Sequence, residues 1–189
     1  MQYLEIEKYK KTDEYHYRSD TVERKRVTMD KSLKSIWGIA ILLMVLETVL
    51  FVLFHDPPRV WLGNLGWVIL WIAAFLAVIP IFTFRKKGGV AKGKSYIERT
   101  TLVNTGLYAL VRHPQYLSFI LICVGIIMAA QEWLISIIGI LATVLIYFAI
   151  RRQDRFLVEK FSDTYIDYMV CVPRVNILIG IARWMRRNR

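Results

Sequence analysis

Long apolar runs constrain the fold of this chain more than any other feature of the sequence. A helix needs about 20 apolar residues to cross the roughly 30 Å hydrocarbon core of a bilayer. Residues 35–55 form one such run, interrupted by Glu47, and residues 60–84 form a second, with Pro80 as an expected kink near its end. A third run extends from residue 116 to residue 150. These runs predict membrane-spanning helices.

The third run is too long for a single span. Gln131 and Glu132 are its one polar break, so we expect spans at 116–130 and 133–150 joined by almost no loop. Both are short for a membrane helix, unless the first begins earlier or the second continues past Ile150. The sequence therefore predicts an all-α integral membrane protein, a bundle of four to five transmembrane helices. Residues 175–182 are too short to span and are expected to re-enter or lie flat on the membrane.

The distribution of positive charge predicts the orientation of the bundle. The net charge is +11, and 56% of the residues are hydrophobic. Residues 1–34 hold nine Lys and Arg, residues 85–115 hold seven and residues 151–189 hold nine, so 25 of the 26 cations fall on one side of the predicted spans. Cytoplasmic loops carry such an excess. We therefore expect both termini on the cytoplasmic side and attribute the basic charge to topology and anionic lipid, not to a nucleic-acid partner.

This organisation predicts a single domain preceded by a basic N-terminal region. Residues 1–34 form a basic N-terminal region expected on the membrane surface, and residues 35–189 form one transmembrane domain with cytoplasmic segments at 100–116 and 151–175. The two cysteines, Cys123 and Cys171, are far apart in sequence and indicate neither a disulfide framework nor a metal site. No glycine-rich loop follows a strand pattern, which excludes a Rossmann cofactor site.

The cytoplasmic segments carry polar groups that a membrane boundary does not require for packing. The first, residues 105–116, combines Arg112, His113, a helix-breaking proline and two tyrosines before an apolar run. The second, residues 151–174, contains acidic side chains, two further tyrosines and Arg174. Desolvating such groups is costly unless each finds a partner. A tight helical hairpin brings its two ends together, so we expect the two segments to form one site.

These segments also carry a family resemblance. The string Thr105-Gly106-Leu107-Tyr108, then Arg112-His113-Pro114 and Tyr116, is followed after the hairpin by Glu159-Lys160-Phe161, Tyr165, Tyr168 and Val172-Pro173-Arg174. This order resembles the isoprenylcysteine carboxyl methyltransferase family, whose superfamily includes membrane phospholipid N-methyltransferases. The resemblance covers about residues 100–175. Family members usually have two glutamates where Gln153-Asp154 stands and a Phe-Gly pair where Phe161-Ser162 stands, so either Asp154 or Glu159 could replace the acidic residue of the family.

The resemblance implies an enzyme that binds S-adenosylmethionine at the cytoplasmic face, releases S-adenosylhomocysteine and methylates a lipid-like acceptor that enters from the bilayer. A guanidinium can bind a carboxylate of the cofactor or of the acceptor, and we expect Arg112 to do so. The predicted catalytic residues are Arg112, Asp154 and Glu159. The predicted cofactor-binding residues are Thr105, Gly106, Leu107, Tyr108, Leu110, His113, Pro114, Tyr116, Tyr165, Tyr168 and Arg174. No metal is expected.

Several alternatives stay open at this level. A prenylcysteine or similar isoprenoid carboxylate needs no general base, because a carboxylate is already ionised near neutral pH. A phospholipid amine would need one, with Asp154, Glu159 or His113 as the candidate. Arg112 could instead be a topology anchor, and Glu47 an interhelical hydrogen-bonding group. A sterol-reductase-like enzyme that uses NADPH and a non-enzymatic membrane adaptor are the competing functions.

Overall fold

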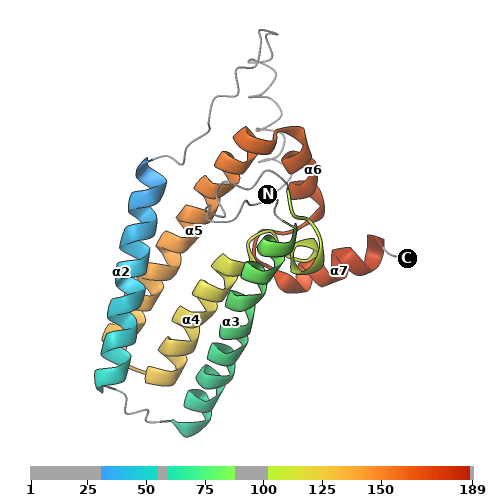
Figure 1. Cartoon of the computed structure of the whole chain (residues 1–189). Coiled ribbons are helices and arrows are strands. Elements are labelled where there is room, and N and C mark those ends of the chain that lie inside the picture. The colour runs from blue at the N-terminus through green and yellow to red at the C-terminus, as the bar shows by residue number, and fades with distance from the viewer. Residues whose placement is uncertain (1–30, 55–58, 88–101, 188–189) are drawn as a thin grey trace.

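A computed structural model describes residues 31–54, 59–87 and 102–187, and within these residues the regular elements are all helices (Figure 1). The predicted all-α fold class is confirmed. The elements, in chain order, are α2 (Lys31–Phe54), α3 (Val60–Lys87), the short 3₁₀ helix η2 (Gly106–Ala109), α4 (Pro114–Ala130), α5 (Trp133–Phe161), α6 (Asp163–Cys171) and α7 (Ile177–Arg187).

Four apolar helices form the bundle. Three of them, α2, α3 and α5, are long and apolar enough to cross a membrane, and α4 is a shorter apolar helix of 17 residues. In Figure 1, α4 and α5 lie between α2 and α3, with α3 packed on α4 and α2 packed on α5. Consecutive helices α2 and α3 therefore pack mainly on different partners and touch each other only locally. Between them, the rings of Phe51 and Trp67 are 6.0 Å apart.

The two short predicted spans, 116–130 and 133–150, are both longer in the structure. Helix α4 begins at Pro114, two residues before the predicted start, and proline is well tolerated at the first helical position. Helix α5 continues past Ile150 to Phe161. Gln131 and Ser162, both with positive φ, follow the last residues of α4 and α5 and end these helices. The residues of α5 beyond Ile150 therefore place the polar end of this helix outside the apolar part of the bundle.

The predicted boundaries at the N-terminal side differ in smaller ways. Helix α2 starts at Lys31, so the last residues of the predicted basic region belong to the first span. Helix α3 continues to Lys87, beyond the predicted end at residue 84. The rest of the N-terminal region, residues 1–30, and most of the loop at 85–101 lie outside the described residues. The predicted short segment at 175–182 is longer than expected and forms α7.

Close helix contacts depend on glycine. A Cβ on Gly66 of α3 would lie 2.6 Å from the backbone carbonyl oxygen of Gly125 on α4, so this pair allows the two backbones to approach. On the other side, Glu47 of α2 is fully buried, and a Cβ on Gly139 of α5 would overlap its carboxyl group. Both Glu47 carboxyl oxygens lack a hydrogen-bond partner among the described residues.

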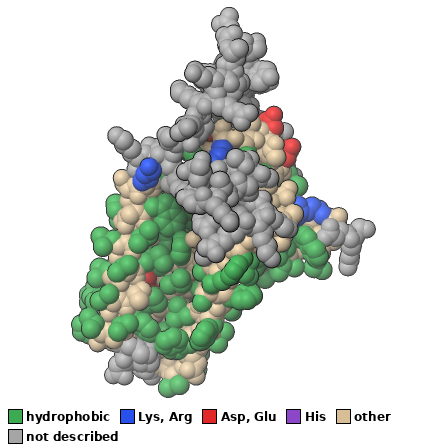
Figure 2. Space-filling view, viewed as in Figure 1, with side chains coloured by type: hydrophobic (Ala, Val, Ile, Leu, Met, Phe, Trp, Pro, Cys, Tyr) green, Lys and Arg blue, Asp and Glu red, His purple; other side chains and the backbone are tan. Residues whose placement is uncertain are grey.

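The outer surface of the bundle is apolar. Large hydrophobic side chains on α2, α3 and α5 are exposed over most of their length, among them Leu42, Val52, Trp71, Phe75 and Ile140. Figure 2 shows hydrophobic side chains covering this part of the molecule, with most of the charged groups visible in this view toward one end. A contiguous apolar surface of this size is expected where lipid replaces water as the solvent.

Candidate active site

Asp154 lies at the centre of a buried polar cluster at the charged end of the bundle. The C-terminal extension of α5 carries it, and its side chain is fully buried. Its Oδ1 is 2.7 Å from Nε2 of His113 and accepts a hydrogen bond from the Tyr165 hydroxyl, also at 2.7 Å. Its Oδ2 accepts a hydrogen bond from Nε of Arg174 at 2.6 Å. One carboxylate thus joins α5 to the segments before α4 and after α6.

Arg112 completes the cluster and leaves donors available. It is 3% exposed, and its Nη1 lies 3.4 Å from Oδ1 of Asp154. Its Nε and Nη2 are buried and have no hydrogen-bond partner among the described residues. Two guanidinium groups, those of Arg112 and Arg174, face a single carboxylate here. A buried donor without a partner is costly, so this edge of the guanidinium is suited to an anionic ligand.

Backbone hydrogen bonds hold the two polar segments together. The amide of Arg112 donates to the carbonyl of Pro173 at 3.0 Å, and the amide of His113 donates to the carbonyl of Arg174 at 3.1 Å. The hydroxyl of Tyr168 donates to the carbonyl of Tyr108 at 2.5 Å. The two segments that the sequence analysis expected to meet are therefore in direct contact.

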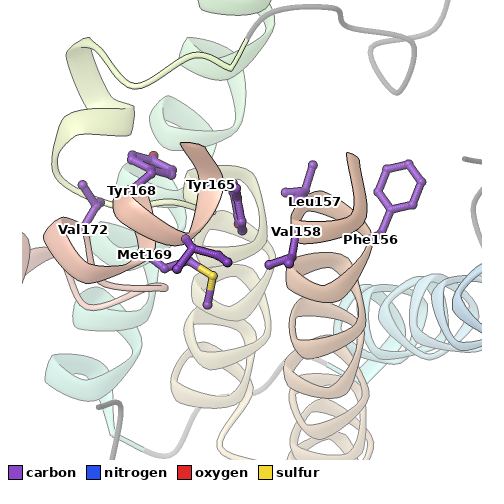
Figure 3. Packing of buried hydrophobic residues seen from close by; sticks show 8 residues of the cluster. Phe156, Leu157, Val158, Tyr165, Tyr168, Met169 and Val172 are labelled. Carbon is purple, nitrogen blue, oxygen red and sulfur yellow. The ribbon is translucent and has the colours of Figure 1, made fainter. Parts of the chain in front are cut away.

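Tyr165 and Tyr168 of this site are packed in an apolar cluster between the end of α5 and α6. Figure 3 shows Phe156, Leu157 and Val158 at the end of α5 and Tyr165, Tyr168, Met169 and Val172 on or after α6. Ser162, with a φ of 48°, separates the two helices. This turn folds α6 back so that Tyr165 is almost completely buried beside Asp154. Burial, and then the charge of Asp154, raise the pKa of the Tyr165 phenol well above its usual value. Tyr165 therefore stays a neutral hydrogen-bond donor.

The turn before α4 contains further predicted cofactor residues. Gly106 has a φ of +64°, a backbone conformation that residues with a Cβ rarely adopt. Thr105, which precedes it, is exposed. The carbonyl of Leu107 accepts hydrogen bonds from the amides of Leu110 and Val111. Pro114 is buried at the start of α4. These residues shape the backbone that presents Arg112 and His113.

Tyr116 links the cluster to α2. Its ring lies 5.3 Å from the ring of His113, and its hydroxyl lies 3.4 Å from Oε1 of Gln153. The same hydroxyl accepts a hydrogen bond at 3.0 Å from Nε1 of Trp37. Trp37 was not among the predicted site residues, because a single tryptophan near a membrane boundary is usually an interfacial anchor.

Glu159 is the predicted catalytic residue that the structure does not bring into the cluster. It is exposed, whereas Asp154 is fully buried on the same helix. Five residues along an α-helix correspond to a rotation of about 140°, so the two side chains point to different sides of α5. Of the two acidic candidates, Asp154 is the one that lies among the other site residues.

An apolar groove lies between α2 and α4 and adjoins the cluster. It has a volume of about 520 Å³. Trp37 belongs to its lining and lies beside Tyr116, with ring centroids 4.7 Å apart, and Phe119 of the lining lies against Trp37 at 5.6 Å. The remaining lining residues come from the same two helices and are apolar except for Thr48: Ile41, Met44, Val45, Thr48, Val49 and Ile122.

Comparison with known proteins identifies the family. Residues 61–164, more than half of the chain, match the family described as phospholipid methyltransferase. The chain belongs to this family. The matched region runs from α3 to the start of α6 and includes Arg112, His113 and Asp154. The family resemblance expected from the sequence is confirmed, and with its apolar helices the chain is an integral membrane protein of a methyltransferase family.

Two of three similar proteins are methyltransferases by name. Protein-S-isoprenylcysteine O-methyltransferase B of Arabidopsis thaliana is 27% identical over 150 residues, which cover 72% of this chain and 71% of that protein. Its A form is 26% identical over 137 residues, 70% of this chain and 68% of the relative. The cobalt-zinc-cadmium resistance protein CzcN of Cupriavidus metallidurans is 32% identical over 92 residues, 46% of this chain and 42% of that protein. Methyltransferases of this family imply S-adenosylmethionine as the methyl donor.

Proposed function

We propose that this phospholipid methyltransferase family member transfers a methyl group from S-adenosylmethionine to the carboxylate of an amphiphile with an isoprenoid-like tail, as in a prenylcysteine. The observation that carries the proposal is the free edge of the Arg112 guanidinium, buried beside Asp154, His113 and Tyr165. Two further supports are the adjoining apolar groove and the names of the two Arabidopsis relatives.

The chemistry of Arg112 fits the ligands of this reaction. Nε–H and the Nη2 group lie on one edge of a planar guanidinium, so together they can donate two parallel hydrogen bonds to a carboxylate. Both the amino-acid end of S-adenosylmethionine and the proposed acceptor carry a carboxylate. We assign Arg112 the role of carboxylate receptor. The effect of an Arg112 substitution on the binding of S-adenosylhomocysteine, measured without acceptor, distinguishes the cofactor carboxylate from the acceptor carboxylate. Tyr116 presents a ring close to His113, where a sulfonium can be stabilised by an aromatic face.

The groove fits the apolar part of the acceptor. Its volume of about 520 Å³ is in the range of ligand sites, about 300–1,000 Å³. It is lined by lipid-facing helices, so a tail can enter sideways from the bilayer without crossing water. Trp37 and Phe119 line the groove, and Trp37 lies beside Tyr116. A ligand whose tail occupies the groove therefore has its polar end next to Tyr116.

Transfer to a carboxylate places modest chemical demands on the protein. When bound, S-adenosylmethionine supplies an electrophilic methyl group on a sulfonium. A bond forms between an acceptor oxygen and the methyl carbon while the sulfur–carbon bond breaks, and the sulfonium charge is neutralised on the leaving thioether. The acceptor is already ionised, so no proton has to be removed. Arg112, His113 and Tyr165 therefore serve to align the reactants and exclude water.

Phospholipid N-methylation is the second candidate, and the 2.7 Å contact between His113 and Asp154 favours it. An amine acceptor must lose a proton, and an imidazole oriented by a carboxylate is a suitable proton acceptor. The description of the matching family names this substrate class as well.

The proposal also includes the orientation of the molecule. The excess of Lys and Arg in the segments that the sequence predicts on the same side as Asp154 favours a cytoplasmic active site, which a soluble cofactor can reach.

A methyl-transfer assay with two acceptors tests the function. The purified protein in lipid nanodiscs is incubated with methyl-labelled S-adenosylmethionine and either a farnesylated cysteine analogue or phosphatidylethanolamine. We expect label in the farnesylated acceptor, released by alkali as an ester is. Transfer to the phospholipid alone would instead establish the second candidate. Calorimetric titration with S-adenosylhomocysteine is the accompanying control, and a folded protein that binds none would contradict both.

A further inference from the structure

The C-terminal helix α7 presents three distinct sides. At 100° per residue, Ile177, Leu178, Ile181, Trp184 and Met185 fall within an arc of about 120°. Gly180, Arg183 and Arg187 fall on a second side, and Ile179, Ala182 and Arg186 on a third. An amphipathic helix buried in a soluble core needs only two sides. Three sides suit a helix that touches protein, lipid and water at once.

The second side docks against the loops of the active site. A Cβ on Gly180 would overlap the backbone carbonyl of Leu110, so glycine is required for this close approach. Arg187 donates from Nη2 to the carbonyl of Ala109 at 3.1 Å, and Arg183 donates from Nη1 to the carbonyl of Val170 at 3.1 Å. Helix α7 is therefore fastened to η2 and to α6, the two elements that flank the Asp154 cluster.

The first side is exposed although it is apolar. Leu178 is 75% exposed, Met185 is 49% exposed, and Ile181 and Trp184 are exposed as well. Figure 1 shows α7 lying crosswise at the end of the bundle that carries α6, not parallel to the spanning helices. In Figure 2, this region shows hydrophobic side chains toward the apolar belt and Lys or Arg side chains away from it. The apolar side of α7 thus faces where the leaflet of a bilayer would be.

We propose that α7 is an interfacial helix that binds the surface of an anionic phospholipid leaflet and ties the active-site loops to it. The apolar side enters the region between headgroups and acyl chains. Arg186, on the side turned away from the protein, attracts anionic headgroups as basic segments beside a membrane do, and the positive charges of Arg183 and Arg187, which hold α7 to backbone carbonyls, add to that attraction. This inference concerns a lipid partner and does not depend on which acceptor the enzyme methylates.

Spin labels on α7 of the full-length protein test this inference. Single cysteines are placed at Leu178 and Met185 on the apolar side, and at Ile179 and Ala182 on the water side, in a Cys171→Ser background. Each labelled protein is studied in nanodiscs of neutral phosphatidylcholine and in nanodiscs with added phosphatidylglycerol. Ile179 is the critical control, because it is apolar but is expected on the water side.

We expect labels at residues 178 and 185 to collide readily with oxygen and rarely with a water-soluble nickel chelate, and labels at 179 and 182 to show the reverse. The contrast between the two sides should increase several-fold with phosphatidylglycerol, and Arg186→Glu should remove that increase. Equal accessibility of all four positions would overturn the interfacial placement. A contrast that does not respond to headgroup charge would overturn the anionic-lipid assignment.

Discussion

The backbone amide of Arg112 donates a hydrogen bond to the carbonyl of Pro173 at 3.0 Å, although 61 positions separate the two residues. The next pair, from His113 to Arg174, continues the contact at 3.1 Å. The side chains of Arg112, His113 and Arg174 then converge on Asp154. The geometry of the site therefore depends on a backbone junction between two loops, and side chains on either loop report on the same cluster.

Replacing Arg112 by Lys tests the proposed carboxylate receptor. Lys keeps the charge but loses the paired donors of the guanidinium, so we expect kcat/KM to fall about 10- to 100-fold, the equivalent of one or two charge-assisted hydrogen bonds. If the ligand is the cofactor carboxylate, the Kd for S-adenosylhomocysteine rises by a similar factor. If it is the acceptor carboxylate, that Kd stays unchanged. Wild-type activity in this variant would contradict both assignments.

Asp154 is expected to be necessary for stability as well as for activity. In Asp154→Asn, the buried guanidinium of Arg112 and the partly buried guanidinium of Arg174 lose the negative charge of Asp154. Removing one partner of a buried ion pair costs about 3–5 kcal/mol. Thermal unfolding in detergent should show a clear decrease in Tm, together with loss of methyl transfer. Glu159→Gln is the matched control on the same helix, because Glu159 is exposed and outside the cluster. A larger loss in Glu159→Gln than in Asp154→Asn would reverse the assignment of the acidic residue.

The raised pKa of Tyr165 predicts how stability depends on alkaline pH. Burial and the Asp154 carboxylate favour the neutral phenol in the folded protein, whereas an unfolded tyrosine ionises near pH 10. The folded state therefore holds its proton where the unfolded state has lost it, so stability falls as pH rises above about 10 and is unaffected by this group below it. Unfolding measured between pH 7 and pH 11 should show a smaller alkaline loss in Tyr165→Phe. Parallel curves for the two proteins would show that Tyr165 does not titrate differently on folding.

Much of this architecture follows from the sequence, and the reason is that the bilayer limits the choices. Apolar runs predict the spanning helices, and a tight hairpin of α4 and α5 requires that the segments beyond its two ends lie together. The position of Glu159 does not follow, because it depends on how far α5 continues past Ile150 and on which side of the helix each residue then falls. The contact between Trp37 and Tyr116 does not follow either, since it joins residues 79 positions apart with no motif to mark it.

The proposed orientation can be checked with the native cysteines. Cys171 is exposed at the end of α6, close to the cluster, and Cys123 is buried in α4. If this end is cytoplasmic, a membrane-impermeant maleimide added to intact cells should not label Cys171, and permeabilisation should make it reactive. Arg59→Cys in a Cys171→Ser background, at the opposite end of the bundle, should react without permeabilisation. Labelling of Cys171 in intact cells would contradict the positive-inside assignment.

Trp37 is expected to position the acceptor without contacting the cofactor. It belongs both to the apolar groove and, through its indole N–H, to the hydrogen bond with Tyr116. Trp37→Ala removes the ring between the groove and the cluster, so the KM for an amphiphilic acceptor should rise about tenfold or more, while the Kd for S-adenosylhomocysteine stays constant. Trp37→Phe keeps an aromatic ring for contact with Tyr116 and Phe119 but loses the donor, so an intermediate KM is expected. Trp71→Phe, a substitution on the exposed side of α3, is the control and should leave both constants unchanged. An unchanged acceptor KM in Trp37→Ala would show that the tail of the acceptor lies outside the groove between α2 and α4.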